Sequence, residues 1–372
     1  MSTLSTYKIV LAAGGTGGHV FPAIAIADAL RDTGKSVHLQ FIGTKDKMEF
    51  VAVPRAGYEI HDIWISGFHR NFTLKNLLFP FKLLRSLLQT RRILKKIQPD
   101  LIVACGGYVA GPVGYVANKL KIPVVLQEQN SLPGVTNRLL ASKADLIFTA
   151  FEQADDFFPK KKTRLLGNPT RKALLKKVGN EAFVAFGFSP NKPTLLVLGG
   201  SLGARAINET VRHNLDLLHN EMGLQILWQC GTRFYDSLIK EVPIKNYDNL
   251  RLVSFLDNMP FAYGISDLVV SRAGASSCAE LLVTGKPSIL VPSPYVAGDH
   301  QTYNAKAMVE NGAAIMLRDH ELSSLFVSTV KDVIFDSEQL ERMSALAFSL
   351  AKPDAAKEIA DQILHLIDSK SN

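Results

Sequence analysis

Cysteine is scarce in this sequence, with only Cys105, Cys230 and Cys278 among 372 residues. The three lie far apart, form no CxxC pair and have no histidines at the spacing of metal ligands, which excludes a disulfide framework and gives no sign of structural zinc. The first residues also lack the basic start and long apolar core of a signal peptide. A reducing cytoplasm is therefore the expected environment.

Long uninterrupted apolar runs are missing as well. Residues 101–118 carry no charge and approach the ~20 residues that a spanning helix needs. However, Gly106, Gly107, Gly111 and Pro112 interrupt this stretch, and such residues favour a short strand, a loop and a helix start. The segment is not expected to cross a membrane.

The composition that is present is that of a folded globular protein, with 47% hydrophobic and 20% charged residues. The length suits two domains, each with its own core. A net charge of +8 favours an anionic partner, which can be nucleic acid, a phosphorylated small molecule or an anionic bilayer. Composition does not choose among these classes.

Short apolar runs alternate with helical patterns along the chain, as a parallel α/β sheet requires. The second half restarts the order of the first, because a strand again runs into a glycine-rich loop and a helix. The sequence thus predicts two similar half-molecules. The expected strands are residues 8–13, 37–42, 101–104, 124–126 and 146–149 in the first half, and 194–198, 226–228, 250–253, 268–270 and 288–291 in the second.

An ordered hinge is expected near Asn168, where glycine and Asn-Pro occur between the halves. We place an N-terminal domain at residues 1–168 and a C-terminal domain at residues 169–352. Residues 355–367 repeat isoleucine with helical spacing, which predicts an amphipathic helix. Residues 353–372 can pack on either domain from the sequence alone.

Two glycine loops are candidate anion sites. Gly14, Gly15, Gly17 and Gly18 lie between a predicted strand and helix, where backbone N–H groups and the helix dipole favour phosphate. The loop is not GxGxxG, which weakens a dehydrogenase interpretation, and its glycines can equally serve a tight turn. His19 follows them and is either a general base or an ordinary packed histidine.

The second glycine loop, residues 199–203, places Ser201 before another helix. Farther on, small residues precede Glu280, whose carboxylate can accept hydrogen bonds from two vicinal hydroxyls or simply be solvated. Gln301 and Asn304 lie three residues apart at a third helix start. Their amides can point to one side and bind sugar hydroxyls, or be an ordinary polar helix start.

With these segments in order, the sequence closely resembles the MurG family, the undecaprenyldiphospho-muramoylpentapeptide β-N-acetylglucosaminyltransferases, which have the GT-B fold. The resemblance covers nearly the whole chain. It implies two Rossmann-like domains whose parallel sheets face each other across a cleft. The C-terminal helix, residues 353–372, would complete the N-terminal domain. The matching motifs are residues 14–19, 106–112, 128–138, 168–171, 199–201, 272–280 and 299–304.

The resemblance implies that the C-terminal half binds UDP-N-acetylglucosamine. Uracil would lie near Arg171 and Leu256, the ribose on Glu280, and the diphosphate on Ser201 and a helix start. Gln301, Asn304 and Asn130 would read the sugar. The donor-binding set as a whole would be Thr16, Gly17, Gly18, Asn130, Arg171, Ser201, Leu256, Ala275, Ser276, Ser277, Cys278, Ala279, Glu280, Gln301 and Asn304.

The same resemblance implies a lipid-linked acceptor, undecaprenyl-diphospho-muramoylpentapeptide. It would be held by Gly14, Gly15, Gly106, Gly107 and Tyr108. The C4 hydroxyl of N-acetylmuramic acid would attack the anomeric carbon with inversion, and His19 is the candidate base. The transition state should resemble an oxocarbenium ion. We expect no cofactor, no obligatory metal and no nucleic-acid partner.

A basic, apolar segment is the candidate membrane surface. The residues that would rest at an anionic bilayer are Phe72, Leu74, Lys75, Leu77, Leu78, Phe79, Phe81, Lys82 and Arg85. An ordinary core-packing helix with a basic outer face explains the pattern equally well. The resemblance favours the membrane, and implies a peripheral protein on the cytoplasmic face of the bacterial inner membrane.

Four alternatives stay open at this point. They are a GT-B transferase with another acceptor, a UDP-N-acetylglucosamine 2-epimerase, a nucleotide-sugar-binding subunit without its own activity, and a dehydrogenase. Product analysis separates the epimerase, because it needs no acceptor. UDP binding without NAD(P)H binding would remove the dehydrogenase.

Overall fold

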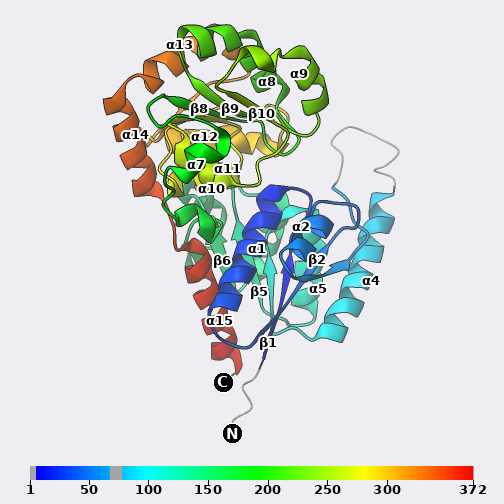
Figure 1. The fold of residues 1–372 in the computed structure, drawn as a ribbon. Coiled ribbons are helices and arrows are strands. Elements are labelled where there is room, and N and C mark those ends of the chain that lie inside the picture. The colour runs from blue at the N-terminus through cyan, green and yellow to red at the C-terminus, as the bar shows by residue number, and fades with distance from the viewer. Residues whose placement is uncertain (1–5, 68–77, 372) are drawn as a thin grey trace. The chain divides into compact units, whose positions relative to one another are not determined.

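The computed structural model describes residues 6–67 and 78–371, and it divides the chain into two compact units. Unit 1 comprises Met1–Thr170 together with Lys352–Asn372, and unit 2 comprises Arg171–Ala351. The chain therefore leaves unit 1, builds the whole of unit 2 and returns. Figure 1 labels elements of both units.

Unit 1 contains a parallel sheet of seven strands in the order β3-β2-β1-β4-β5-β6-β7. All of the expected strands of the first half are confirmed. Two further strands, β3 and β7, occupy the edges. The strands are β1 (Tyr7–Ala12), β2 (Val37–Gly43), β3 (Glu59–Asp62), β4 (Leu101–Ala104), β5 (Val124–Glu128), β6 (Leu146–Thr149) and β7 (Thr163–Leu165).

The helices of unit 1 cover both faces of this sheet. Successive residues of β1 point to opposite faces, so Ile9 and Leu11 enter one core cluster while Val10 and Ala12 enter another. The first cluster includes α1, α2 and α15, and the second includes α4, α5 and α6. The helices are α1 (Gly17–Asp32), α2 (Glu49–Arg55), α4 (Phe79–Ile97), α5 (Gly107–Lys119), α6 (Val135–Leu140) and α15 (Ala355–Ser371).

The C-terminal helix α15 packs beside α1, as Figure 1 shows. Its buried Ile359, Ile363 and Ile367 join the same core as Ile9 and Leu11 of the first strand. The predicted amphipathic helix is confirmed, and its isoleucine stripe belongs to unit 1.

Unit 2 contains a parallel sheet of six strands in the order β10-β9-β8-β11-β12-β13. The expected strands of the second half are confirmed, and β13 adds one edge. The strands are β8 (Thr194–Leu198), β9 (Gln225–Gln229), β10 (Leu250–Val253), β11 (Leu268–Ser271), β12 (Ser288–Leu290) and β13 (Ala314–Met316).

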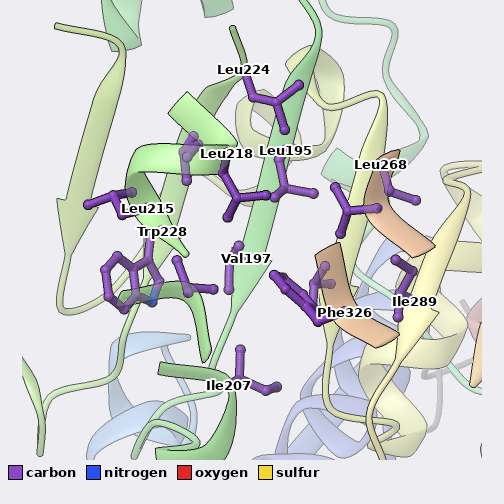
Figure 2. Close-up of a cluster of buried hydrophobic side chains, with 14 of the residues drawn as sticks. Leu195, Val197, Ile207, Leu215, Leu218, Leu224, Trp228, Leu268, Ile289 and Phe326 are labelled. Atoms are coloured by element: carbon purple, nitrogen blue, oxygen red, sulfur yellow. The ribbon is translucent and has the colours of Figure 1, made fainter. Parts of the chain in front are cut away.

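A large apolar cluster holds one face of the unit 2 sheet against its helices. Leu195 and Val197 of β8 meet Ile207 of α8, Trp228 of β9 and Phe326 of α13 there (Figure 2). The helices of unit 2 are α7 (Glu181–Phe186), α8 (Arg205–His213), α9 (Tyr235–Glu241), α10 (Met259–Ile265), α11 (Ala275–Val283), α12 (His300–Val309), α13 (Leu322–Ile334) and α14 (Ser337–Leu350).

Candidate active site

The strand order of unit 1 reverses direction between β1 and β4. In open parallel sheets, the loops that leave the carboxyl ends of the strands beside such a reversal form the ligand site. Here those loops are the first glycine loop after β1 and residues 105–106 after β4, and the loop after β5 is their neighbour. The topology thus brings together the motifs that the sequence pointed to.

The first glycine loop interlocks with the loop after β4. Gly107 has a φ of +73°, and a Cβ atom on it would lie 2.3 Å from the carbonyl oxygen of Gly14. A side chain at this position is therefore impossible without moving the backbone. Gly106 is similarly close to the imidazole of His19, since its Cβ would lie 2.8 Å from Cδ2.

His19 is held in the first turn of α1. Its Nδ1 lies 3.1 Å from Oγ1 of Thr16, the N-cap residue of that helix. Gly17 and Gly18 are the first two helical residues, so their N–H groups precede the first intrahelical hydrogen bonds. A histidine, a hydroxyl and two backbone N–H groups that precede the first intrahelical hydrogen bonds thus lie together beyond the carboxyl end of β1.

Glu49 of α2 supports the candidate site and was not identified from the sequence. Its side chain is fully buried, and its carboxylate accepts hydrogen bonds from the backbone N–H groups of Gly15 and Thr44, at 3.3 and 3.2 Å. A Cβ on Gly14 would lie 2.8 Å from Oε1 of Glu49. The glycine loop therefore rests on a buried carboxylate, and the Gly15 N–H points into the protein.

Tyr108 closes this arrangement from the start of α5. Burial, and secondarily the charge of Glu49, raise the pKa of its phenol. A Cβ on Gly15 would lie 2.9 Å from Cε1 of the tyrosine ring. The close approach of the ring and of Glu49 explains in packing terms why residues 14 and 15 are glycines.

The loop after β5 is organised by Glu128. This carboxylate is almost completely buried and accepts hydrogen bonds from Asn130, Gly134 and Asn137, the shortest being 2.8 Å from Nδ2 of Asn137. Burial raises the pKa of Glu128, while these hydrogen bonds oppose the rise. Asn130 is therefore held by both its backbone N–H and its side-chain amide.

Unit 2 repeats the topology, because its strand order reverses between β8 and β11. The loop after β8 contains Ser201, which is exposed and precedes the start of α8 at Arg205. Its carbonyl oxygen accepts a hydrogen bond from the N–H of Thr232 at 3.2 Å. Ser201 thus lies in the turn before the helix and not in the helix itself.

The loop after β11 leads directly into α11, with Gly274 as N-cap. The N–H of Cys278 already bonds to the carbonyl oxygen of Gly274, so the unshared amides are those of Ala275, Ser276 and Ser277. Oγ of Ser276 is buried and has no hydrogen-bond partner among the described residues. A polar atom of this kind, beside a helix N-terminus, suits an anionic ligand.

Two apolar residues, Cys278 and Ala279, follow these serines in α11. Cys278 and Ala279 are buried, and burial raises the pKa of the Cys278 thiol to about 12. A thiol in that state is not a nucleophile near neutral pH. Cys278 therefore contributes packing and not covalent chemistry.

Glu280, one turn farther along α11, meets two partners. Its Oε2 accepts a hydrogen bond from the hydroxyl of Tyr263 at 3.0 Å, and its Oε1 lies 3.5 Å from Nη2 of Arg171. Burial raises the pKa of Glu280, and the guanidinium and phenol oppose the rise. Glu280 is thus a largely buried, oriented carboxylate and not a solvated helix glutamate.

Gln301 and Asn304 begin α12, and both side chains make hydrogen bonds within unit 2. Oε1 of Gln301 accepts from the N–H of Ser293 at 2.8 Å, and Nδ2 of Asn304 donates to the carbonyl oxygen of Ala273 at 3.1 Å. Asn304 is fully buried, whereas Gln301 is half-buried. Asn304 therefore ties α12 to the turn before α11.

The remaining site residue of unit 2 is Leu256, which follows β10 and is buried. Among the described residues, no group of three or more His, Cys, Asp or Glu side chains can hold a metal ion.

The candidate membrane surface lies only partly within the described residues. Phe72, Leu74, Lys75 and Leu77 fall outside them. In the described part, Phe81, Leu84 and Leu88 of α4 are 68%, 60% and 62% exposed. The face of α4 that packs inward carries Ser86, Thr90 and Leu94. The helix thus presents Phe81, Leu84 and Leu88 outward, while other apolar residues of α4 pack against the core.

Cations and an aromatic ring border these apolar residues. Lys82 and Arg85 lie over the Trp64 ring, with Nζ and Cζ 5.5 and 5.3 Å from its centroid. Leu78 is exposed, and Phe79 is half-buried. No helix in the described part of the chain combines the length and apolar character needed to cross a membrane.

Comparison with known proteins identifies the family. Residues 9–149 match the glycosyltransferase family 28 N-terminal domain, and residues 194–359 match its C-terminal domain. The UDP-N-acetylglucosamine–N-acetylmuramyl-(pentapeptide) pyrophosphoryl-undecaprenol N-acetylglucosamine transferase of Flavobacterium psychrophilum is 44% identical over 99% of this chain and 100% of its own. The chain belongs to the MurG family. The enzyme of the same name from Christiangramia forsetii is also 44% identical, over 98% of both chains.

A solved MurG structure agrees with this membership. The crystal structure of MurG from Acinetobacter baumannii is 30% identical in sequence and covers 97% of this chain and 100% of its own, with a TM-score of 0.76. The expected GT-B class is confirmed at the level of two parallel-sheet α/β units. MurG membership also places the loops described above in a glycosyltransferase that uses a nucleotide sugar.

Proposed function

We propose that this protein transfers N-acetylglucosamine from UDP-N-acetylglucosamine to the C4 hydroxyl of N-acetylmuramic acid in undecaprenyl-diphospho-muramoylpentapeptide, with inversion. The observation that carries the proposal is the 44% identity, over essentially the full length of both chains, to a transferase named for this reaction. The proposal is also supported by the loops at the strand-order reversal of each unit, which are candidate anion-binding sites. This reaction is a step of peptidoglycan synthesis.

In the proposed donor site, unit 2 binds the UDP moiety. Glu280 accepts the ribose hydroxyls, and Arg171 and Leu256 line the uracil. The departing diphosphate accepts hydrogen bonds from Ser201 and from the first backbone N–H groups and serine hydroxyls of α11. Because negative charge grows on the leaving group, these fixed donors stabilise the transition state more than the ground state.

The sugar is read by amides in the same proposal. Gln301 and Asn130 supply hydrogen bonds to its hydroxyls, and Thr16, Gly17 and Gly18 complete the donor set from unit 1. Asn304 belongs to the same sugar-binding set, and one hydrogen bond of its amide nitrogen also holds the turn at Ala273. Cys278 and Ala279 form the apolar wall beside the diphosphate.

The acceptor is assigned to unit 1, where Gly14, Gly15, Gly106, Gly107 and Tyr108 form the interlocked loops. His19 is the proposed general base. If Nδ1–H donates to Oγ1 of Thr16, 3.1 Å away, the lone pair lies on Nε2 and can take the proton of the attacking hydroxyl. The proposed mechanism uses neither a metal nor a cofactor.

Membrane association is proposed for the outward face of α4. A bilayer with anionic headgroups suits it, because exposed Phe81, Leu84 and Leu88 can enter the headgroup boundary while Lys82 and Arg85 meet phosphate. The protein would then work peripherally at the cytoplasmic face of the inner membrane, where its lipid-linked acceptor is found.

The deciding assay uses purified protein, radiolabelled UDP-N-acetylglucosamine and lipid-linked muramoylpentapeptide in detergent. We expect labelled lipid to form. UDP binding without labelled lipid would show that the acceptor is wrong. Formation of UDP-N-acetylmannosamine or its free sugar without an acceptor would instead indicate an epimerase.

The base is tested by His19→Ala. Loss of a general base is expected to lower kcat by about 10²- to 10⁴-fold with little change in UDP binding. His38→Ala is the matched control, since His38 is exposed at the beginning of β2, at the opposite end of the strands. Near-normal turnover of His19→Ala would remove His19 from this role.

A further inference from the structure

Tyr263 is buried at the point where three elements of unit 2 converge. It lies on α10, while Glu280 lies on α11 and Arg171 precedes the short 3₁₀ helix Lys172–Leu175. Both α10 and α11 contact that short helix. The ring of Tyr263 is 1% exposed, so only its hydroxyl has a directional role.

The hydroxyl of Tyr263 donates a hydrogen bond to Oε2 of Glu280 at 3.0 Å. The phenol is neutral near pH 7, as an ordinary tyrosine is, and burial, and then the adjacent carboxylate, raise its pKa further. A neutral phenol donates its proton to a carboxylate, so the bond fixes both the side-chain rotamer and the orientation of the carboxylate plane.

The geometry then divides the two oxygens of Glu280 between two directions. Oε2 is held by the phenol, and Oε1 faces the guanidinium of Arg171 at 3.5 Å. Two vicinal hydroxyls can bind a carboxylate side by side only if that carboxylate keeps one plane. Burial already disfavours the charged form of Glu280. Without the Tyr263 hydroxyl, its carboxylate would also lose its fixed orientation.

We propose that Tyr263 is a positioning residue that sets the selectivity of this protein for ribose in its nucleotide-sugar donor. Tyr263 acts through Glu280 and does not itself contact the donor. The inference rests on the proposed function, specifically on the assignment of the ribose hydroxyls to Glu280.

The test measures donor discrimination with the full-length enzyme. The kcat/KM ratio for UDP-N-acetylglucosamine over its 2′-deoxyribose analogue is determined for the wild type, Tyr263→Phe and Glu280→Gln. Tyr263→Phe removes one oxygen and keeps the buried ring. We expect the ratio to fall about tenfold, the size typical of a hydrogen bond to a charged group, and toward that of Glu280→Gln.

Tyr247→Phe is the matched control. Tyr247 is also a buried tyrosine of unit 2, and its hydroxyl donates to a carboxylate oxygen of Asp216 at 2.6 Å. It has no place in the proposed donor site, so its substitution is expected to leave the ratio unchanged. Equilibrium binding of UDP and 2′-deoxy-UDP gives the same comparison without turnover, for a variant of low activity.

The outcomes separate the inference from the proposed function. If Tyr263→Phe keeps the wild-type ratio while Glu280→Gln loses it, Glu280 reads the ribose without help and the inference is wrong. If both variants keep the ratio, the ribose assignment of Glu280 fails as well. An equal fall in Tyr247→Phe would show that the loss reflects general loosening of unit 2, which also overturns the inference.

Discussion

At the scale of single residues, three carboxylates in the candidate loops and helices of the two units are buried in different ways. Glu49 is held by backbone N–H groups, Glu128 by amides and backbone, and Glu280 by a phenol and a guanidinium. Each carries hydrogen bonds that compensate for its removal from water. Each therefore shapes a loop or a ligand site and is not an ordinary surface acid.

Glu49→Gln is expected to impair the acceptor side. A glutamine amide can accept at one position only, so its NH₂ group would face a backbone N–H of either Gly15 or Thr44. An unsatisfied buried donor costs about 1–3 kcal/mol, and the glycine loop should shift. We expect kcat/KM for the acceptor to fall roughly tenfold or more, measured at saturating donor.

The internal control for Glu49→Gln is the affinity for UDP, measured by calorimetry. The proposed ligands of UDP lie in unit 2, whereas Glu49 accepts its hydrogen bonds from Gly15 and Thr44 of unit 1. UDP affinity should therefore stay within about twofold of the wild type. A wild-type acceptor kcat/KM would refute the role of Glu49 in holding the loop.

The pH dependence of donor binding should report Glu280. Because burial raises its pKa, protonation begins at a higher pH than for an ordinary carboxyl group. The carboxylate is the form that accepts ribose hydroxyls, so the donor KM should rise as the pH falls from neutral. In Glu280→Gln, this rise should disappear, because no titratable group remains there. An unchanged pH profile in that variant would assign the titration elsewhere.

At the scale of elements, α4 carries the exposed apolar residues Phe81, Leu84 and Leu88 beside the cations Lys82 and Arg85. Leu84→Glu and Leu88→Glu place a negative charge where the proposed bilayer contact lies. We expect each to weaken binding to vesicles that contain anionic lipid by about tenfold or more. Transfer to a detergent-solubilised acceptor should remain near normal.

Val184→Glu provides the control for these helix variants. Val184 is 78% exposed on α7 of unit 2. Val184→Glu therefore also replaces an exposed apolar side chain by glutamate, but outside the proposed membrane surface. Vesicle binding is measured by sedimentation and by the emission of Trp64, which lies beside Lys82 and Arg85. Binding that survives both α4 substitutions would show that α4 is not the membrane surface.

The sequence predicted the central strands well because they are short, uniformly apolar runs. Buried strands such as β4 and β8 show no alternation with polar residues, as both faces of the sheet are covered. The edge strand β3 was missed because Glu59, His61 and Asp62 give it a polar sequence. Only pairing with β2 identifies it as a strand.

The residues of the candidate site could be named from the sequence where the signal is local. Glycine loops and helix starts can be read from short segments, and the structure gathers them at the two strand-order reversals. Glu49 and Tyr263 were missed because their importance arises from contacts with residues far along the chain, Gly15 and Glu280. No short motif around either residue distinguishes it from an ordinary helix residue.

At the scale of the whole molecule, α15 is the segment that completes unit 1. Ile363→Ala should destabilise that unit by about 2–5 kcal/mol, because Ile363 is fully buried against the core of α1 and β1. Gln362→Ala on the exposed side of the same helix is the matched control, with an expected change within ±0.5 kcal/mol.

Hydrogen exchange locates this effect. In Ile363→Ala, amides of β1 and α1 should exchange faster, while those of β8 and α8 should keep their wild-type rates. Equal acceleration in both units would mean that they unfold together and that α15 stabilises the entire chain.

The return of the chain to unit 1 has a consequence for how the protein is made on the ribosome. Ile359, Ile363 and Ile367 emerge only after all of unit 2, Arg171–Ala351, has been synthesised. At about 5–20 residues per second, that interval lasts roughly 10–40 s. Unit 2 can finish folding during this time. Unit 1, which was synthesised first, still exposes the apolar surface that α15 will cover. The N-terminal half of this protein is thus the last to be completed, and a nascent chain stalled near its end would present that surface to chaperones.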